Sequence, residues 1–157
     1  SCAEEAVVLY RRLVEEDPVH LSDLASTLNN LGVLYSQLGR LQDASWATEE
    51  ATYHYESLAL TNPANLSELA GALNNLGIYH GELGRPDDAL ASTERAVAFY
   101  RGLASDNPAY LSPLANTLNN LGDRYSDLGR PEQADVAFAE ARSYLTGPSR
   151  SGTYEIS

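Results

Sequence analysis

Three pairs of asparagines are the side chains in this chain with the clearest capacity for recognition. They lie at positions 29–30, 74–75 and 119–120, each inside a Leu-Asn-Asn-Leu-Gly pentapeptide. A carboxamide carries a hydrogen-bond donor and an acceptor, so it can pair with the N–H and C=O groups of an extended peptide whatever that peptide's side chains. Because successive copies begin 45 residues apart, stacking of the copies would place the asparagines in a row.

Catalytic chemistry has weaker candidates. The three histidines, His20, His54 and His80, lack metal-type spacing, and Cys2 is the only cysteine. All ten basic residues are arginine, which excludes a phosphate-binding P-loop lysine or a Schiff-base lysine. No Gly-x-Ser-x-Gly nucleophile motif occurs. We therefore expect no catalytic residue, no metal ligand and no cofactor, and we interpret His80 as a packed core residue.

Charge and hydropathy exclude further classes. Acidic residues number 22 against 10 basic ones, which gives a formal net charge of −12 and argues against binding to nucleic acid. No segment approaches the roughly 18 apolar residues of a membrane span. A single cysteine cannot form an internal disulfide, which favours a reducing, cytoplasmic location. The chain begins without Met or a signal peptide, which indicates a boundary inside a longer protein.

The asparagines belong to a helical pattern. Apolar residues recur at steps of three and four from residue 21 to 38, and a second helix is predicted from about 42 to 61. Gly39 is expected to close the first helix in the left-handed conformation, and the Pro63 ring to end the second. Ser112 and Pro113 are expected to be the N-cap and first position of a later helix.

Small residues predict close packing within each helix pair. Glycine lies in the middle of each first helix, where it costs up to about 1 kcal/mol relative to alanine. Close approach of the second helix would offset this cost. The residues concerned are Gly32, Gly77 and Gly122, with facing alanines at Ala44, Ala51, Ala89, Ala96, Ala134 and Ala141.

These residues resemble the tetratricopeptide repeat. Leu-Gly, a tyrosine three residues later, Leu-Gly-Arg, two alanines and a closing proline follow its order, although its usual length is about 34 residues. The long unit and the Leu-Asn-Asn-Leu-Gly core are most similar to the kinesin-light-chain-like subgroup. The resemblance implies an all-α, right-handed superhelical solenoid of antiparallel helix pairs, with about 3.5 repeats and seven helices. His80 stands where Tyr35 and Tyr125 stand, and Thr48 and Thr93 replace the usual aromatic residue.

The 45-residue period divides the chain. Residues 1–19 align with the second helix of a truncated unit, three units occupy 20–64, 65–109 and 110–146, and 147–157 is expected to be a flexible tail. The truncation is expected to leave Val7, Tyr10 and Val14 without a neighbour. Asp135 and Arg142 give the last helix the polar face of a terminal cap.

The resemblance assigns one face of the first helices to the concave groove that binds a peptide. Small Ser36 and Gly81 would leave room there, and the acidic side chains at one end predict a basic or polar ligand. The candidate peptide-binding residues are Asn29, Asn74, Asn119, Ser26, Asn116, Val33, Ile78, Asp123, Ser36, Glu82 and Asp127.

Two functions therefore stay open. The first is a non-enzymatic scaffold that binds an extended segment of another protein in the groove. The second is a self-association or sensor region of a larger signalling protein, such as an NTPase, with a homo-oligomer formed through the N-terminal half-repeat. A third hypothesis combines these two: residues Thr153–Ser157 would dock in a groove of the same chain or of a second copy. Structural interpretations compete with these functions. The second asparagine of each pair would bond an adjacent helix or turn, and a solvated outer face would consist of Glu49, Glu50, Glu94 and Arg95.

Overall fold

A computed structural model describes residues 1–146; the predicted tail, residues 147–157, lies outside the described residues. Within residues 1–146 the chain forms seven α-helices and three short 3₁₀ turns, and no strand. The helices are α1 (Cys2–Glu16), α2 (Leu21–Gln37), α3 (Leu41–Thr61), α4 (Leu66–Glu82), α5 (Pro86–Asp106), α6 (Leu111–Asp127) and α7 (Pro131–Thr146). The turns are η1 (Pro18–His20), η2 (Pro63–Asn65) and η3 (Pro108–Tyr110).

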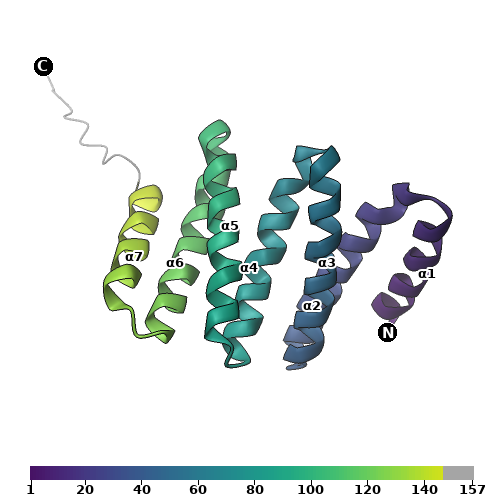
Figure 1. Cartoon of the computed structure of the whole chain (residues 1–157), viewed down its shortest axis with the longest axis horizontal. Helices are drawn as coiled ribbons and strands as arrows, with labels where there is room; N and C mark the ends of the chain where they lie inside the picture. The colour runs from purple at the N-terminus through teal and green to yellow at the C-terminus, as the bar shows by residue number, and fades with distance from the viewer. Residues whose placement is uncertain (147–157) are drawn as a thin grey trace, which may run out of the picture.

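The helices stand side by side in one extended row (Figure 1). Each helix packs against the next along the chain, and α4 also contacts both α2 and α6. In the view of Figure 1, α3 and α5 lie in front of α2 and α4, so the even-numbered helices form one layer and the odd-numbered helices the other. The predicted all-α solenoid of antiparallel helix pairs is confirmed.

Tight turns after α2, α4 and α6 follow the predicted chemistry. Gly39, Gly84 and Gly129 have φ values of 74°, 73° and 68°, a region that glycine enters without steric cost. The N–H three residues past the end of each of these helices donates to a carbonyl five residues earlier, as from Arg40 to Tyr35 at 2.8 Å. Pro86 then begins α5 and Pro131 begins α7.

The opposite ends of the pairs are joined by an Asx turn that leads into a 3₁₀ helix. The Asn107 side chain accepts a hydrogen bond from the N–H of Ala109 at 3.0 Å, and η3 continues directly into α6. The predicted N-cap at Ser112 is therefore wrong, because α6 already begins at Leu111. Pro113 is tolerated in the first turn, where a helix has no partner for its N–H groups.

Close packing within each pair depends on the helical glycines. A Cβ atom on Gly77 would overlap Thr93 Oγ1 and lie 3.2 Å from the Ala89 carbonyl oxygen. The same arrangement joins Gly32 to Thr48, and in the last pair Phe138 packs on Gly122. The six predicted alanines are all buried. The expected offset to the glycine cost is therefore present in all three pairs, with threonine on α3 and α5 and Phe138 at the equivalent position of α7.

The N-terminal helix differs from its prediction. Val7 is buried, and Tyr10 and Val14 pack against the core of the first pair, so these side chains do not lack a neighbour. They face α2, which follows them in the chain. The exposed apolar side chains of α1 are Val8 and Leu9, and α2 adds Leu34 and Leu38. Tyr79, the residue 45 positions after Leu34, is buried because α2 covers that side of α4.

A glutamate on each of α1, α3 and α5 bonds the next even-numbered helix, and we name this contact the clasp. In each clasp the glutamate precedes its ring-bearing partner by 31 residues in the sequence. The partner lies toward the end of the even-numbered helix that follows. Glu49 and Glu94 are exposed, as expected for an outer face, and each also bonds a ring on the next even-numbered helix. The clasps are Tyr35–Glu4 at 2.6 Å, His80–Glu49 at 3.1 Å and Tyr125–Glu94 at 2.9 Å.

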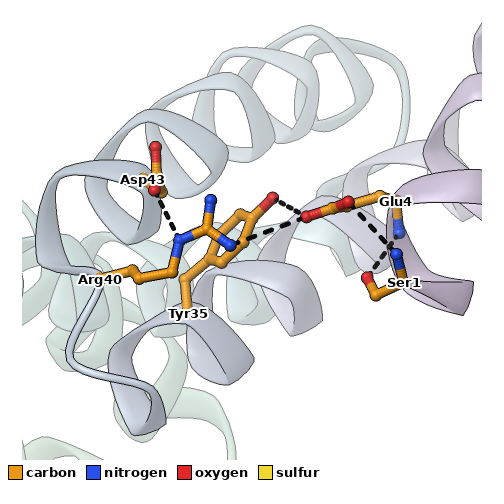
Figure 2. Close-up of polar contacts among 5 residues, drawn as sticks. All are labelled: Ser1, Glu4, Tyr35, Arg40 and Asp43. Atoms are coloured by element: carbon orange, nitrogen blue, oxygen red, sulfur yellow. Dashed lines mark hydrogen bonds and ion pairs between the residues drawn. The ribbon is translucent and has the colours of Figure 1, made fainter.

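Figure 2 shows the first clasp with its surroundings. The Tyr35 hydroxyl donates to Glu4, and the Arg40 guanidinium lies 4.4 Å above the Tyr35 ring while its Nε donates to Asp43 at 2.8 Å. The hydrogen bond from Tyr35 lowers the pKa of the Glu4 carboxyl, and the same bond raises the pKa of the Tyr35 hydroxyl. Ser1 caps α1 by accepting from the Glu4 N–H at 3.3 Å. Together these contacts link α1 to the turn between α2 and α3.

Candidate protein-interaction face

The predicted asparagines share one side of α2, α4 and α6, and we name this side the carboxamide face. It consists of the predicted site residues and their neighbours on these three helices. Ser26, Asn116, Asp123, Glu82 and Asp127 are exposed, whereas Asn29, Asn74, Asn119, Val33, Ile78 and Ser36 are half-buried. Contacts of α4 with α2 and α6 bring the three helices together along the array.

A hydrogen bond between neighbouring pairs orients the middle asparagine. Asn120 Nδ2 donates to Asn74 Oδ1 at 2.9 Å. Asn120 is the second asparagine of its pentapeptide, and its bond to α4 agrees with the prediction that the second asparagine of each pair bonds an adjacent helix or turn. The Asn74 acceptor is therefore occupied, and within residues 1–146 its Nδ2 has no hydrogen-bond partner. Asn74 can offer a donor to a ligand, and this changes the expectation that each carboxamide offers both groups.

The side-chain amide of Asn29 has the same orientation as that of Asn74, but no asparagine among residues 1–146 donates to it. Its Oδ1 is buried and has no hydrogen bond within the described residues. Asn75, the counterpart of Asn120, does not close this gap, and Asn30 is exposed. A buried acceptor without a partner costs about 1–3 kcal/mol. The two asparagines therefore share a donor-outward orientation, but only Asn74 is held there by a neighbour.

Side chains of the following helix occupy the space that small residues were expected to leave. Tyr79 hydrogen-bonds Ser36, and the Arg124 guanidinium lies where a Cβ on Gly81 would be. Arg124 Nη1 donates to the Gly77 carbonyl at 3.1 Å. Ser36 and Gly81 thus accommodate inter-pair packing, so the predicted room for a ligand at these positions is wrong.

The same arginine changes the charge at the acidic end. Arg124 Nε lies 3.4 Å from an Asp127 carboxylate oxygen, and the Arg124 side chain is mostly buried. Asp123 and Glu82 are exposed. Part of the predicted acidic character is therefore balanced inside the face, and Asp123 and Glu82 are left as its main exposed carboxylates.

Two tyrosines that the sequence analysis missed reach this face from the other layer. Tyr55 of α3 hydrogen-bonds Ser26, and a Cβ on Gly71 would lie 3.4 Å from the Tyr100 hydroxyl of α5. Burial raises the pKa of both phenols. Their 45-residue spacing was the available signal, but sequence periodicity alone does not show that a side chain extends past the neighbouring helix.

Residues 1–146 give little support to a histidine site, a metal site or a membrane-spanning helix. His80 is buried and bonded to Glu49, as expected for a core residue. Among residues 1–146, no three His, Cys, Asp or Glu side chains gather so as to hold a metal ion. None of the helices described is long and apolar enough to cross a membrane.

Solved structures share this fold. BtubC (BKLC) from P. vanneervenii superposes with a TM-score of 0.66 at 24% identity, over 92% of this chain and 55% of that one. The N-terminal domain of stress-induced protein-1 (STI-1) from C. elegans gives 0.57 at 17% identity, covering 82% and 89% of the two chains. MamA MSR-1 C2 gives 0.50 at 21% identity over 92% and 68%. The present chain spans about half the length of BtubC.

Sequence comparison gives the family. No curated protein matches the chain. A tetratricopeptide repeat family model matches three segments, residues 24–45, 69–109 and 114–143, which together make up more than half of the sequence. The second and third segments contain the Asn74 and Asn119 pentapeptides, and the first contains that of Asn29. Because this model matches more than half of the chain, and the paired helices and glycine turns agree with it, the chain belongs to the tetratricopeptide repeat family.

Proposed function

We propose that this chain is a non-enzymatic protein-interaction scaffold whose carboxamide face binds an extended segment of another polypeptide. Its family supports the scaffold role. The observation that carries the peptide proposal is the Asn120–Asn74 hydrogen bond, which occupies Asn74 Oδ1 and leaves Nδ2 as a donor. A fixed amide donor suits the carbonyl groups of an extended strand, which every peptide has. The 45-residue spacing supports a place in the kinesin-light-chain-like subgroup.

Charge and shape narrow the proposed ligand. Exposed Glu82 and Asp123 favour a basic or polar residue, while half-buried Val33 and Ile78 offer apolar contact. Arg124 lies among them and would disfavour a second cation at its own position. The ligand is therefore a strand with mixed character, bound mainly through its backbone.

An isosteric substitution tests the donor. Asn74→Asp keeps an oxygen that accepts from Asn120 but removes the Nδ2 donor. The probe is a displayed library of random dodecapeptides selected on the wild-type chain. We expect the selected peptides to bind Asn74→Asp roughly tenfold more weakly, since a hydrogen bond contributes about 1 kcal/mol and a repelled carbonyl adds to the loss.

A matched control separates charge from geometry. Asn30→Asp adds the same charge at the exposed second asparagine of the first pair, and peptide affinity should stay within about twofold of wild type. Equal binding of selected peptides to wild type and Asn74→Asp, or failure of any peptide to enrich, would contradict the proposal.

A second candidate is self-association or a sensor role within a larger signalling protein. It is favoured by exposed Leu34 and Leu38 on α2, beside a cavity of about 290 Å³ that Ser1, Glu4 and Arg40 also line. Sedimentation of wild type and of the double variant Leu34→Ser, Leu38→Ser over a range of concentrations tests it. A wild-type dimer that the variant loses supports this candidate, and monomers in both remove it.

A further inference from the structure

Helix α3 presents a row of large apolar side chains to solvent. Trp46, Tyr53 and Leu60 are 60%, 66% and 88% exposed. Their spacing of seven residues returns each side chain to nearly the same side of the helix after two turns. We name these three residues the α3 stripe. It extends about 21 Å along the helix axis at 1.5 Å per residue.

The fold itself does not require this row. The equivalent positions on α5, 45 residues later, carry Ala91, Ala98 and Ser105, and α5 forms the same contacts with its neighbours. On α7 the residue equivalent to Tyr53 is Ser143. Large apolar side chains at all three positions therefore occur on α3 alone among the helices described, and packing within the array does not account for them.

A groove adjoins the stripe on its N-terminal side. A cavity of about 530 Å³ lies between α1, α2 and α3, with Trp46 and exposed Val8 on its walls and Leu28 and Leu31 among its lining residues. Trp46 thus joins the α3 stripe to this groove, which reaches α1 at Val8. Scattered exposed apolar residues need no explanation, but a contiguous patch marks an interaction site.

The charges around the patch define its partner. Helices α1 and α3 together carry eight carboxylates and two arginines, a net charge of −6 that is half of the chain's −12. Helix α3 has four carboxylates and no basic residue of its own. Three ion pairs bring arginines to α3 carboxylates: Arg11–Glu50 at 2.7 Å, Arg40–Asp43 at 2.8 Å and Arg95–Glu56 at 2.5 Å. With Arg40 and Arg95 included, eight carboxylates face four arginines, so the surrounding surface keeps a net charge of −4. A cationic partner gains from this field and a second copy of the chain is repelled by it.

We propose that the α3 stripe binds a basic amphipathic helix of a partner protein. Leucine-like side chains on one side of that helix contact Trp46, Tyr53 and Leu60, and lysine or arginine residues beside them face the carboxylates of α1 and α3. A helix of at least about four turns matches the length of the stripe. This site lies on the odd-numbered layer, whereas the carboxamide face lies on the even-numbered helices (Figure 1). The two surfaces can therefore act independently.

The chain contains its own reporter for this site. Trp46 is the only tryptophan, so a blue shift of its emission records the removal of this side chain from water. The probe is a synthetic Leu/Lys peptide of about 18 residues with helical amphipathic spacing. A Leu/Glu peptide of the same pattern and a Leu/Lys peptide with scrambled order serve as controls. We expect a saturable blue shift with the amphipathic Leu/Lys peptide. Either control peptide should bind at least roughly tenfold more weakly.

Variants taken from α5 test the residues. Tyr53→Ala with Leu60→Ser copies the equivalent α5 positions and keeps Trp46, and it should weaken binding of the Leu/Lys peptide by roughly tenfold or more. Val136→Ala on α7 removes a side chain that is 68% exposed and should leave affinity unchanged. Thermal unfolding by circular dichroism should be the same for all three proteins, because the substituted residues are exposed.

Several outcomes would overturn the proposal. Equal binding of the Leu/Glu or scrambled peptide would show that charge or amphipathic order is irrelevant. A blue shift that grows with protein concentration without peptide, together with a doubled mass in light scattering, would make a second copy the occupant. A blue shift on phosphatidylcholine vesicles without one on the peptide would assign the stripe to a lipid surface. Asn74→Asp should bind the Leu/Lys peptide normally, so failure at one surface is distinguishable from failure at the other.

Discussion

The carboxamide face and the α3 stripe differ in how they relate to the 45-residue period. Asn29, Asn74 and Asn119 repeat in every pair, and the structure uses part of their hydrogen-bonding capacity between pairs. Trp46 and Tyr53 have small counterparts on α5 and are mostly exposed. In a repeat array, a residue that recurs is thus constrained by packing as well as by any ligand. A residue that occurs in one pair only is not constrained by packing between repeats, so it is easier to assign to a function.

The largest expected effect comes from a position that repeats. Gly77→Ala should destabilise the chain by about 1–3 kcal/mol, because its Cβ would overlap Thr93 Oγ1 and crowd the Ala89 carbonyl. Urea unfolding measures the loss. Adding Thr93→Ala should recover most of it by removing the obstructing atom.

A glycine outside the close contact provides the control for this prediction. Gly102 of α5 has no atom within 4 Å of its would-be Cβ, so Gly102→Ala should stabilise by up to about 1 kcal/mol. Destabilisation by Gly102→Ala, or none by Gly77→Ala, would mean that the repeated glycines do not set the distance between helices.

The clasps should have the next largest effect. Tyr125→Phe removes the hydroxyl that donates to Glu94 at 2.9 Å and should cost about 1 kcal/mol. Tyr53→Phe alters an exposed tyrosine of the α3 stripe and should stay within about 0.5 kcal/mol of wild type. Chemical denaturation of both variants would separate the repeated contact from the unit-specific one, and equal losses would remove the distinction.

Sequence periodicity predicted the helices, the glycine turns and the fold class because these depend on local chemistry. Gly39 and Pro63 act on their own backbone, and the 3.6-residue pattern needs no knowledge of neighbours. The N-cap at Ser112 failed because the preceding 3₁₀ turn continues into α6 without a break. Local rules do not describe how two consecutive elements join.

The candidate site was predictable in outline only. The face of α2, α4 and α6 follows from the helical wheel, but the fate of its polar groups depends on distances between pairs. Asn120 bonding Asn74 and Arg124 covering Gly81 join residues more than 40 positions apart. The clasps could have been found, because glutamate and a ring-bearing residue both recur at 45-residue steps with a constant offset.

A smaller, pH-dependent effect is expected at His54. Burial lowers the pKa of His54 from its usual 6.5, so the folded chain favours the neutral imidazole. The stability this provides is complete above the unfolded pKa and is lost as the pH falls toward the folded pKa. His54→Phe copies Phe99 of α5, and its free energy of unfolding should fall less than that of wild type between about pH 7 and pH 5. Parallel pH profiles from urea titrations would contradict this assignment.

The smallest effect concerns a ladder of ion pairs that alternates in sign along the odd-numbered helices. Arginine and glutamate exchange places at each step, at a constant offset of 39 residues. The pairs are Arg11–Glu50, Glu56–Arg95 and Arg101–Glu140. All are substantially exposed, so each should contribute about 0.2–1 kcal/mol. Omitting one helix would bring like charges together, as with Arg11 and Arg95, so the ladder favours the native order of helices more than it stabilises any one contact.

A charge exchange tests this view. Arg95→Glu should destabilise by about 0.5–1 kcal/mol, because it replaces the ion pair with Glu56 by a repulsion between two carboxylates. Adding Glu56→Arg should restore stability, since the pair is reformed with its polarity reversed. Both effects should shrink at about 1 M salt, where the screening length is about 3 Å. If the double variant unfolds as easily as the single one, the alternation of charges has no part in ordering the helices. The acidic surface beside the α3 stripe would then not depend on that alternation.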